Sequence, residues 1–581
     1  MSWAEVTVAL RGGSGGQHRL QRLTVQGAAL TQVRGFMHPP RRFGAGDPQP
    51  VRQDCGQLAA QLAGLHAGQL VDQRMLGRGQ LAAKHLQAFQ HVQALGRGQR
   101  IERQIQRAFD VRAKTVEHLD DLLTTTRTHV RIVGRQTDTP HPAKPHLWMN
   151  PQLWITRHPT AATYPRGMND AQGRIRIPDD LDSVTAIGDE DHSGIDPQAV
   201  ERIWQAARHW YQAGMHPAIQ LCLRHNGKVV LNRAIGHGWG NAPTDEPDAE
   251  KIPVKTDTPF CVYSSAKAIT ATVVHMLVER GHFSLDDKVC QYIPSYTSHG
   301  KDRTTIRHVI THSAGVPFPT GPKPDLKRAD DHEYAQEQLG NLRPIYRPGL
   351  VHIYHALTWG PLMREIVYAA TGKDIRDILA TEILDPLNFR WTNFGVAEQD
   401  IPLVAHSHPT GHPLLPAPIA AAFRKAIGGT THEIIPITNT PLFLKTVVPS
   451  SNTISNADEM SRFAEIWRRG GELDGVRVMS PETLKAAAKQ CRRLRPDVAT
   501  GLLPARWGTG FQLGTKRFGP FGRNAPHAFG HLGLVNCAIW TDPERQLAAG
   551  VVSSGKPGRD PEVKRYTALM DRIAAEIPRV S

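Results

Sequence analysis

The chain has 581 residues, 40% hydrophobic and 21% charged, so it is long enough for more than one domain and has the balance of a globular protein. No apolar run reaches the roughly 18 residues that indicate a membrane-spanning helix. The N-terminus also lacks the basic and apolar stretches of a secretory signal. Six scattered cysteines without a C-x-x-C pair are typical of buried thiols in a reducing compartment. We therefore expect a soluble, cytoplasmic protein.

The net charge of +15 lies mostly in the first quarter of the chain. Residues 1–150 contain 20 Lys and Arg against 10 Asp and Glu, whereas the remainder contains 49 against 44. Few aromatic residues accompany the basic ones in this first segment, so it lacks groups on which bases could stack. We expect no nucleic-acid partner.

Residues 1–165 differ in composition from the rest of the chain. The first 150 positions contain 18 glutamines, and glycine interrupts the apolar periodicity. Such a segment has little continuous apolar surface to bury. We predict that it is poorly ordered, forms a small independent unit, or is not native coding sequence, with translation starting near Met149 or Met168. Residues 190–581 are predicted to form the main domain.

Regular apolar spacing begins near residue 195. It predicts a helix over 196–213, followed by strands at 218–224 and 228–233. Asn226-Gly227 between the strands is a strong signal for a tight β-hairpin.

The second half of the domain contains helical and loop-rich stretches. Residues 305–400 are predicted to be mainly helical, and 405–450, with many Pro, His and Thr, to be a loop-rich insertion. Another hairpin is predicted from 534–541 and 546–553, before a last helix at 561–577. Strands from both ends of the domain would then share one antiparallel sheet, as in an α+β fold.

The S-x-x-K motif at 264–267 is the strongest local indication of chemistry. A strand-like run at 259–263 precedes it, and apolar residues at the spacing of an amphipathic helix follow it until Gly281. Ser264 and Lys267 would lie on one face of that helix. The amine could accept the hydroxyl proton and turn a poor nucleophile into a good one. The positive end of the helix dipole would favour a developing anion.

The same spacing occurs at 298–301 and 553–556. The first of these copies lies in a polar stretch predicted to be a loop, and the second follows a predicted final strand. Only at 264–267 does a strand-like run lead directly into a helical pattern, so we predict that Ser264 is the nucleophile. The alternative is an ordinary helix-capping serine. Ser265 is less suited, because its side chain would point away from Lys267.

Further motifs follow in a fixed order. They are Leu285-Asp286-Asp287, Tyr292-Ile293-Pro294, Thr305 to Pro317, Pro348-Gly349, Tyr354-His355-Ala356 and Gly530-His531-Leu532-Gly533. Together with Phe260 to Lys267, they resemble the motifs of the β-lactamase and penicillin-binding-protein-like serine hydrolases, and most closely those of the family VIII carboxylesterases. The resemblance covers roughly residues 195–560. It implies a β-lactamase/transpeptidase-like α/β (α+β) fold, in which helices flank an antiparallel sheet beside a mainly helical subdomain.

The resemblance also implies a proton relay. Tyr354 takes the place of the tyrosine in the family's second motif, Tyr-x-Asn. A phenol has an ordinary pKa of about 10, so it needs a neighbouring cation to act as a phenolate. Lys267 would supply that charge, and both groups would move the serine proton to the leaving group. His355 is expected to be structural.

The third motif would form the other side of the site. The resemblance implies that the backbone amides of Ser264 and Leu534 form the oxyanion hole. Gly533 would let the strand edge approach the substrate closely. His531 would donate a hydrogen bond to the substrate or to Tyr354, and would titrate near pH 6.5.

Two departures from the family pattern bear on the substrate. Ala356 replaces the asparagine of the second motif, and His531 replaces the lysine of Lys-Thr-Gly. Both losses weaken recognition of penicillin-like or D-Ala-D-Ala ligands, while acylation of Ser264 is unaffected. We therefore predict a serine hydrolase that cleaves small carboxylic esters through an acyl-enzyme. The alternatives are a β-lactamase or D-Ala-D-Ala carboxypeptidase, and a catalytically inactive binding protein. The oligomeric state stays open.

Three other patterns are discounted. Residues 12–16 fit G-x-S-x-G but have no strand before them and no helix after them. His308 and His312 have zinc-ligand spacing without the intervening glutamate. The His-Ser-His stretch at 406–408 has no nearby cluster of further metal-ligating residues in the sequence. We expect neither a metal nor a cofactor.

Overall fold

The structure, a computed structural model, places two compact units, Met1–Pro145 and His146–Ser581. It describes residues 3–10, 19–26, 173–320, 325–412, 417–496, 504–517, 519–558 and 563–580.

In the first unit, the structure describes two strands, β1 (Trp3–Leu10) and β2 (Arg19–Gln26). They pair antiparallel, with Trp3 opposite Gln26. The rest of residues 1–165, including the discounted glycine-rich motif and Met149, lies outside the described residues, as does Met168. The expected poor order of this segment and the domain boundaries therefore stay predictions.

The second unit is built on an antiparallel sheet. Its strands, in spatial order, are β12 (Arg492–Pro496), β13 (Pro504–Trp507), β14 (Gln512–Leu513), β15 (Phe529–Leu532), β16 (Ala538–Asp542), β17 (Leu547–Ser553), β4 (Ala218–His225), β5 (Lys228–Trp239) and β3 (Thr185–Ile187), and β6 (Ile252–Pro253) also pairs with β5. A small second sheet, in the order β7 (Phe260–Cys261), β9 (Thr453–Ser455) and β8 (Asn393–Phe394), leads into the candidate site.

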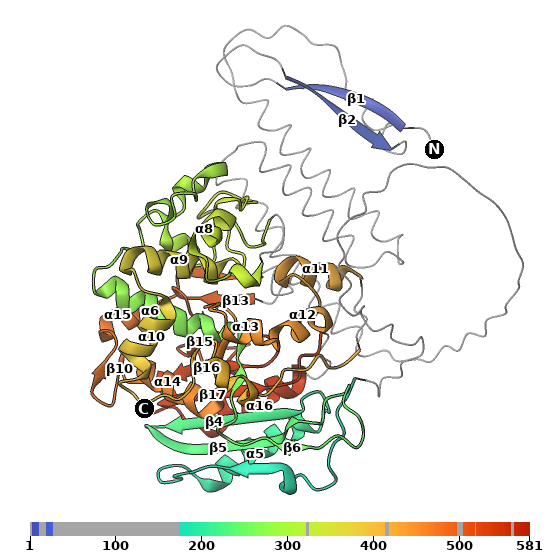
Figure 1. Cartoon of the computed structure of the whole chain (residues 1–581), viewed down its shortest axis with the longest axis vertical. Helices are drawn as coiled ribbons and strands as arrows, with labels where there is room; N and C mark the ends of the chain where they lie inside the picture. Colours follow the sequence, from blue (N-terminus) through green and yellow to red (C-terminus); the bar gives the residue numbers. More distant parts are fainter. Residues whose placement is uncertain are drawn as a thin grey trace, which may run out of the picture. The chain divides into compact units, whose positions relative to one another are not determined.

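Both ends of the domain meet in this sheet, as the sequence predicted. Strand β17 pairs with β4 from Leu547 opposite His225 to Ser553 opposite Ile219, and Figure 1 shows the late strand β17 beside the early strands β4 and β5. The predicted hairpin is confirmed: Asn226 and Gly227 both have positive φ, 52° and 85°. These are the angles that a two-residue turn matching the strand twist requires.

The two faces of the sheet bury different helices. Along β4, Ile219, Leu221 and Leu223 join the core of α5 (Pro197–Tyr211) and α16 (Val563–Glu576), whereas Cys222 joins the core of α6 (Ala266–Glu279) and α14 (Ala457–Arg468). Alternate residues of a strand point to opposite faces, which produces this division. The helices predicted at 196–213 and 561–577 are thereby confirmed.

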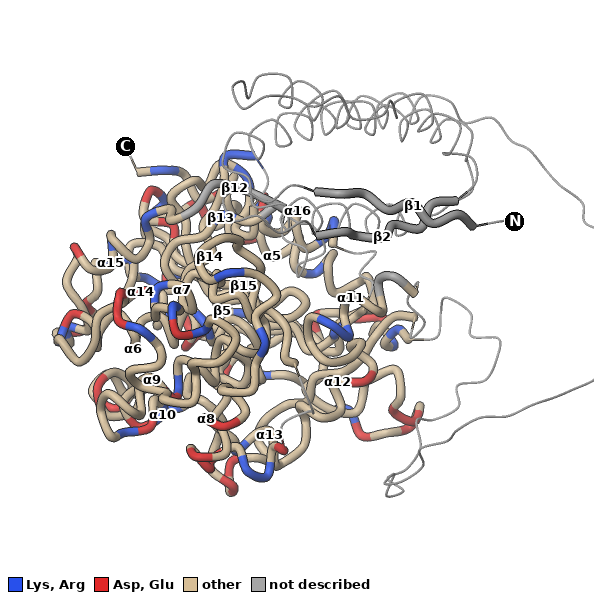
Figure 2. Tube along the Cα trace, turned by 90° about the horizontal axis from the view of Figure 1, so that it is seen from above, with Lys and Arg blue, Asp and Glu red and all other residues tan. Residues whose placement is uncertain are grey.

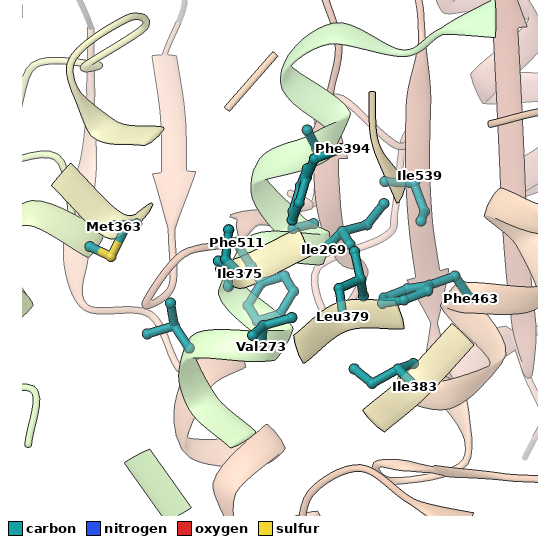
Figure 3. Close-up of a cluster of buried hydrophobic side chains, with 14 of the residues drawn as sticks. Ile269, Val273, Met363, Ile375, Leu379, Ile383, Phe394, Phe463, Phe511 and Ile539 are labelled. Atoms are coloured by element: carbon teal, nitrogen blue, oxygen red, sulfur yellow. The ribbon is translucent and has the colours of Figure 1, made fainter. Parts of the chain in front are cut away.

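Helix α6 lies in the centre of the domain. Every residue from Ala266 to Leu277 is buried, so the expectation of an amphipathic helix is wrong. Its polar side chains bond to the backbone inside the core: the hydroxyl of Thr272 donates to Ala268 O, and the His275 ring bonds Thr509 O. Figure 3 shows Ile269 and Val273 of this helix among buried aliphatic and aromatic side chains from several other elements.

The helical subdomain and the insertion complete the fold. Described helices in the predicted helical stretch are α7 (Ile306–Ile310), α8 (His332–Gly340), α9 (Trp359–Thr371) and α10 (Ile375–Leu379). The 405–450 stretch contains α11 (Ala417–Ile427), α12 (Thr431–Thr438) and α13 (Pro441–Lys445), so its description as loop-rich is wrong. Pro436 inside α12 and Pro441 at the start of α13 interrupt the apolar pattern, while Thr430 and Thr440 still cap these helices.

The described cysteines match the predicted buried thiols only in part. Cys222, Cys261 and Cys537 are buried thiols, as predicted, but Cys290 is partly exposed and Cys491 is exposed.

Figure 2 shows basic and acidic residues interspersed along the described part of the second unit. Among the described residues, no helix combines the length and the hydropathy needed to cross a bilayer.

Candidate active site

The candidate nucleophile lies in a sharp turn between β7 and α6. Val262 N donates to Thr453 O over 2.9 Å, and residues 263–265 then form one 3₁₀ turn before the α-helix begins. Tyr263 has φ 50°, a left-handed conformation that is unusual for a bulky residue. Its hydroxyl is held by Thr438 Oγ1 at 2.9 Å. The predicted strand, turn and helix around Ser264 are therefore present, with a strained residue directly before it, as is common at functional sites.

Lys267 is completely buried and points at the serine. Its Nζ lies 3.3 Å from Ser264 Oγ, 3.1 Å from Ala356 O and 2.9 Å from Ser450 O. Burial lowers the pKa of Lys267 well below its ordinary value. A neutral amine has two hydrogens and one lone pair. In the neutral form, the two carbonyls would accept both hydrogens, because a carbonyl can only accept, and the lone pair would be available to Ser264 Oγ.

Tyr354 comes from a loop before α9 and completes the expected trio. Lys267 Nζ lies 5.1 Å from the centre of its ring. The ring is packed against those of His312 at 4.8 Å and Trp507 at 5.7 Å. The structure thus brings Ser264, Lys267 and Tyr354 together. The lowered pKa of Lys267 counts against the expectation that this residue supplies a positive charge for the phenol.

The histidines beside Tyr354 have fixed hydrogen bonds. His355 Nδ1 lies 2.6 Å from Ile353 O, and its Nε2 accepts from Val316 N at 3.2 Å. Both ring nitrogens of His355 are therefore used within the protein, as its expected structural role requires. His312 Nδ1 accepts from His355 N, and burial lowers the pKa of His312 well below its ordinary value.

His531 differs from its expected behaviour. Burial, with the nearby Lys267, lowers its pKa to about 3, so it is neutral near pH 7 and does not titrate near 6.5. Its Nδ1 lies 2.7 Å from Leu532 O and must carry the hydrogen, because a carbonyl only accepts. Nε2 is then an acceptor, buried and without a hydrogen-bond partner among the described residues. The neutral ring cannot donate from Nε2 as expected, but it can accept a hydrogen bond there.

The strand that carries His531 lies directly against the nucleophile turn. Ser265 Oγ donates to His531 O at 3.3 Å, which gives this serine a structural use. A Cβ on Gly533 would lie 2.4 Å from Val262 O, so only glycine allows this approach. The predicted positions of Gly533 and Leu534 beside the turn follow from this contact.

The other two S-x-x-K copies also contain buried lysines. Lys301 Nζ bonds Ser298 Oγ at 2.8 Å, and Ser298 Oγ in turn lies 3.1 Å from Gly340 O, which can only accept its hydrogen. Lys556 Nζ instead donates to the carbonyl of Ser553 at 2.6 Å. Neither copy therefore presents a hydroxyl whose proton the lysine can take.

Several residues of the site gave no signal in the sequence. The carbonyls of Ala356 and Ser450 orient Lys267, and Trp507 packs against Tyr354. A backbone carbonyl has no side-chain signature, so sequence reasoning had no means of finding the first two. Trp507 ends β13, a strand too short to show a clear apolar periodicity. In the described part of the chain, no cluster of three or more His, Cys, Asp and Glu side chains could hold a metal ion.

Comparisons with known proteins place this geometry in a wider context. A family model described as Beta-lactamase matches residues 207–572. The chain is 30% identical over 338 residues to a protein of Mycobacterium tuberculosis named "Esterase/beta-lactamase LipL", covering 56% of this chain and 74% of that protein. It is 25% identical over 248 residues to "Acyltransferase mokF" of Monascus pilosus, covering 38% of this chain and 58% of that protein.

Solved structures share the fold. A penicillin-binding protein homologue from Caulobacter crescentus aligns with a TM-score of 0.56 and 22% identity. A family VIII carboxylesterase aligns with a TM-score of 0.55 and 22% identity. Each alignment covers 66% of this chain and 99% of the solved one.

Proposed function

The chain belongs to the beta-lactamase family of serine hydrolases, and within that family we propose that it cleaves carboxylic esters through an acyl-enzyme on Ser264. The observation that carries this proposal is the placement of Lys267. Its Nζ lies 3.3 Å from Ser264 Oγ and within hydrogen-bond distance of two carbonyls, and burial lowers the pKa of the amine, which favours the neutral form that can accept a proton. This is the arrangement that a general base for a serine nucleophile requires.

Acylation begins when Ser264 Oγ attacks the ester carbonyl. The hydroxyl proton passes to Lys267 Nζ, which becomes an ammonium in a site that disfavours charge. Tyr354, whose ring lies beside that nitrogen, relays a proton to the alkoxide that leaves as the carbon–oxygen bond breaks. Water then attacks the acyl-enzyme carbonyl and gives up a proton to Lys267 and Tyr354. That proton passes to Ser264 Oγ as its bond to the acyl group breaks, which releases the acid and restores the serine.

The developing oxyanion needs two donors. We assign this role to the backbone N–H groups of Ser264 and Leu534. Ser264 lies in the first turn ahead of α6, where N–H groups have no partner within the helix. Leu534 follows Gly533, whose close approach to Val262 brings this strand end to the nucleophile turn. Removing one such donor typically costs about 2.7–4 kcal/mol of transition-state stabilisation.

The preference for esters rests on the polar groups that the site contains. Penicillin-like substrates carry a carboxylate, for which a fixed cation in the third motif would be useful. His531 occupies that position as a neutral ring, and Ala356 offers no side-chain amide. An uncharged ester needs neither group. The name of the mycobacterial relative includes both activities, so both substrates belong in the test.

The experiment compares p-nitrophenyl butyrate with nitrocefin, and labels the enzyme with a fluorophosphonate probe followed by peptide mapping. We expect ester turnover, little nitrocefin turnover, and label on Ser264. Fast nitrocefin turnover without esterase activity would replace the proposal with a β-lactamase. Folded protein without any label would indicate an inactive binding protein.

A further inference from the structure

The turn that carries Leu534 has an unusual backbone. It joins β15 to β16, and Gly533 N donates to Cys537 O over 2.7 Å to close it. Inside the turn, Val535 has φ 44° and Asn536 has φ 68°. Asparagine tolerates this left-handed conformation, but a β-branched residue such as valine rarely adopts it. Such strain persists only where surrounding contacts hold the backbone in place.

Lys556, from the third S-x-x-K copy, supplies those contacts. It is completely buried, and its Nζ donates to Val535 O at 3.2 Å and to Ser553 O at 2.6 Å. Its Nζ also lies 3.2 Å from Cys537 Sγ, at the end of the turn. The hydroxyl of Ser553 donates to the same Val535 carbonyl at 3.1 Å. Two buried donors thus converge on the carbonyl of the strained residue.

The same amine reaches the nucleophile turn. Lys556 Nζ lies 5.1 Å from the centre of the Tyr263 ring, a distance at which an ammonium is attracted to an aromatic face. Tyr263 directly precedes Ser264, and Val535 directly follows Leu534. One side chain therefore contacts the neighbours of both amides assigned to the oxyanion hole.

We propose that Lys556 is a positioning residue that sets the spacing of the Ser264 and Leu534 amides by holding the strained Val535 turn against Tyr263. This inference rests on the proposed function, because it concerns the same oxyanion hole. Lys556 itself does not touch the reacting atoms. Its effect should therefore fall on the transition state, where the oxyanion forms, and not on binding of the uncharged substrate.

Lys301 is a matched control. It is also fully buried, it donates to the two carbonyls of Gly340 and Leu342, and its Nζ lies 5.2 Å from the centre of the Tyr296 ring. None of these partners borders a proposed catalytic group. If Lys556 served only to stabilise the core, its loss and the loss of Lys301 would have similar consequences.

The test compares Lys556→Met with Lys301→Met in the full chain. We measure Tm, the rate of covalent labelling by a fluorophosphonate, and kcat and KM for p-nitrophenyl butyrate. Both variants should have a lower Tm. Lys556→Met should also lower the labelling rate and kcat about 100-fold, the smaller effect seen when one oxyanion donor is lost, with KM within about twofold. Lys301→Met should leave all three kinetic values within about twofold. Equal kinetics in the two variants would overturn the proposal.

A suppressor separates positioning from general stability. Asparagine adopts the left-handed conformation more readily than valine. Adding Val535→Asn to Lys556→Met should therefore recover part of the labelling rate, about tenfold; no recovery would count against a role in holding this turn.

Two further results would still leave the proposal testable. If Lys556→Met does not fold, Ser553→Ala decides, because it removes one hydrogen bond to Val535 O: a labelling rate about fivefold lower supports the proposal, and an unchanged rate overturns it. If the wild-type chain is labelled at Ser264 but hydrolyses no ester, the proposed function fails. The labelling rates still test Lys556 in that case.

Discussion

Two of the three S-x-x-K copies place a serine hydroxyl beside a buried lysine, yet only one has the hydrogen bonds of a catalytic pair. The distance from Nζ to Oγ is 3.3 Å at Ser264 and 2.8 Å at Ser298. At Ser298, Gly340 O takes the hydroxyl hydrogen, and the lysine donates to the oxygen. Both lysines also donate to two backbone carbonyls, but no hydrogen-bond partner of Ser264 Oγ other than Lys267 is described. The bond from Ser298 Oγ to Gly340 O, and not the spacing or the distance, therefore separates the two pairs.

The largest expected effect comes from removing each hydroxyl. Ser264→Ala should abolish fluorophosphonate labelling and lower kcat for p-nitrophenyl butyrate by more than about 10⁴-fold, because the hydroxyl that lies beside the Lys267 amine is lost. Ser298→Ala, the matched change, should leave kcat within about twofold. Covalent label retained in Ser264→Ala would show that another residue is the nucleophile.

Removing each amine should give the next largest difference. Lys267→Met should lower kcat by about 10²–10⁴-fold, the range typical of a general base. Lys301→Met should lower Tm instead, since it removes the lysine donor from the buried carbonyls of Gly340 and Leu342 and leaves Gly340 O only Ser298 Oγ. Steady-state kinetics and thermal unfolding of both variants test this pair. If Lys301→Met were as inactive as Lys267→Met, the loss of activity would reflect removal of a buried lysine and would not support Lys267 as the general base.

Tyr354→Phe sharpens the assignment of the relay. The aromatic packing with His312 and Trp507 is kept, and only the hydroxyl is lost. We expect kcat to fall about 10²-fold while KM changes little. The effect should shrink with better leaving groups, because these need less protonation; a loss independent of the leaving group would place Tyr354 elsewhere in the mechanism.

The pH dependence should give the smallest but most specific signal. Burial lowers the pKa of Lys267, so acylation should rise with pH and level off well below pH 10.5, the ordinary pKa of lysine. Between the two pKa values the folded chain binds fewer protons than the unfolded chain, so this group makes the free energy of unfolding increase with pH. Lys267→Met should remove that slope. A pH–rate profile measures the first effect and Tm against pH measures the second. Lys301→Met is the control for the pH–rate profile, which it should leave unchanged.

Much of the fold and the placement of Ser264 beside Lys267 could be predicted from the sequence. The Asn226-Gly227 turn, the strand and helix around Ser264, and the terminal hairpin beside the early one are local patterns that the structure retains. The short helices of the 405–450 insertion were missed, because proline interrupts their periodicity while capping residues still stabilise them. Sequence patterns predict a turn, strand or helix well when one continuous segment contains all the residues that form it.

Only the tertiary structure decided how the groups of the site are charged and oriented. The carbonyls that turn the lone pair of Lys267 toward Ser264 come from Ala356 and Ser450, far along the chain. Burial by many segments makes His531 neutral, and Lys556 joins two turns that the sequence separates. Burial and hydrogen-bond direction are sums over distant parts of a chain, so a motif determines which atoms are present, and packing determines which of them can hold a proton.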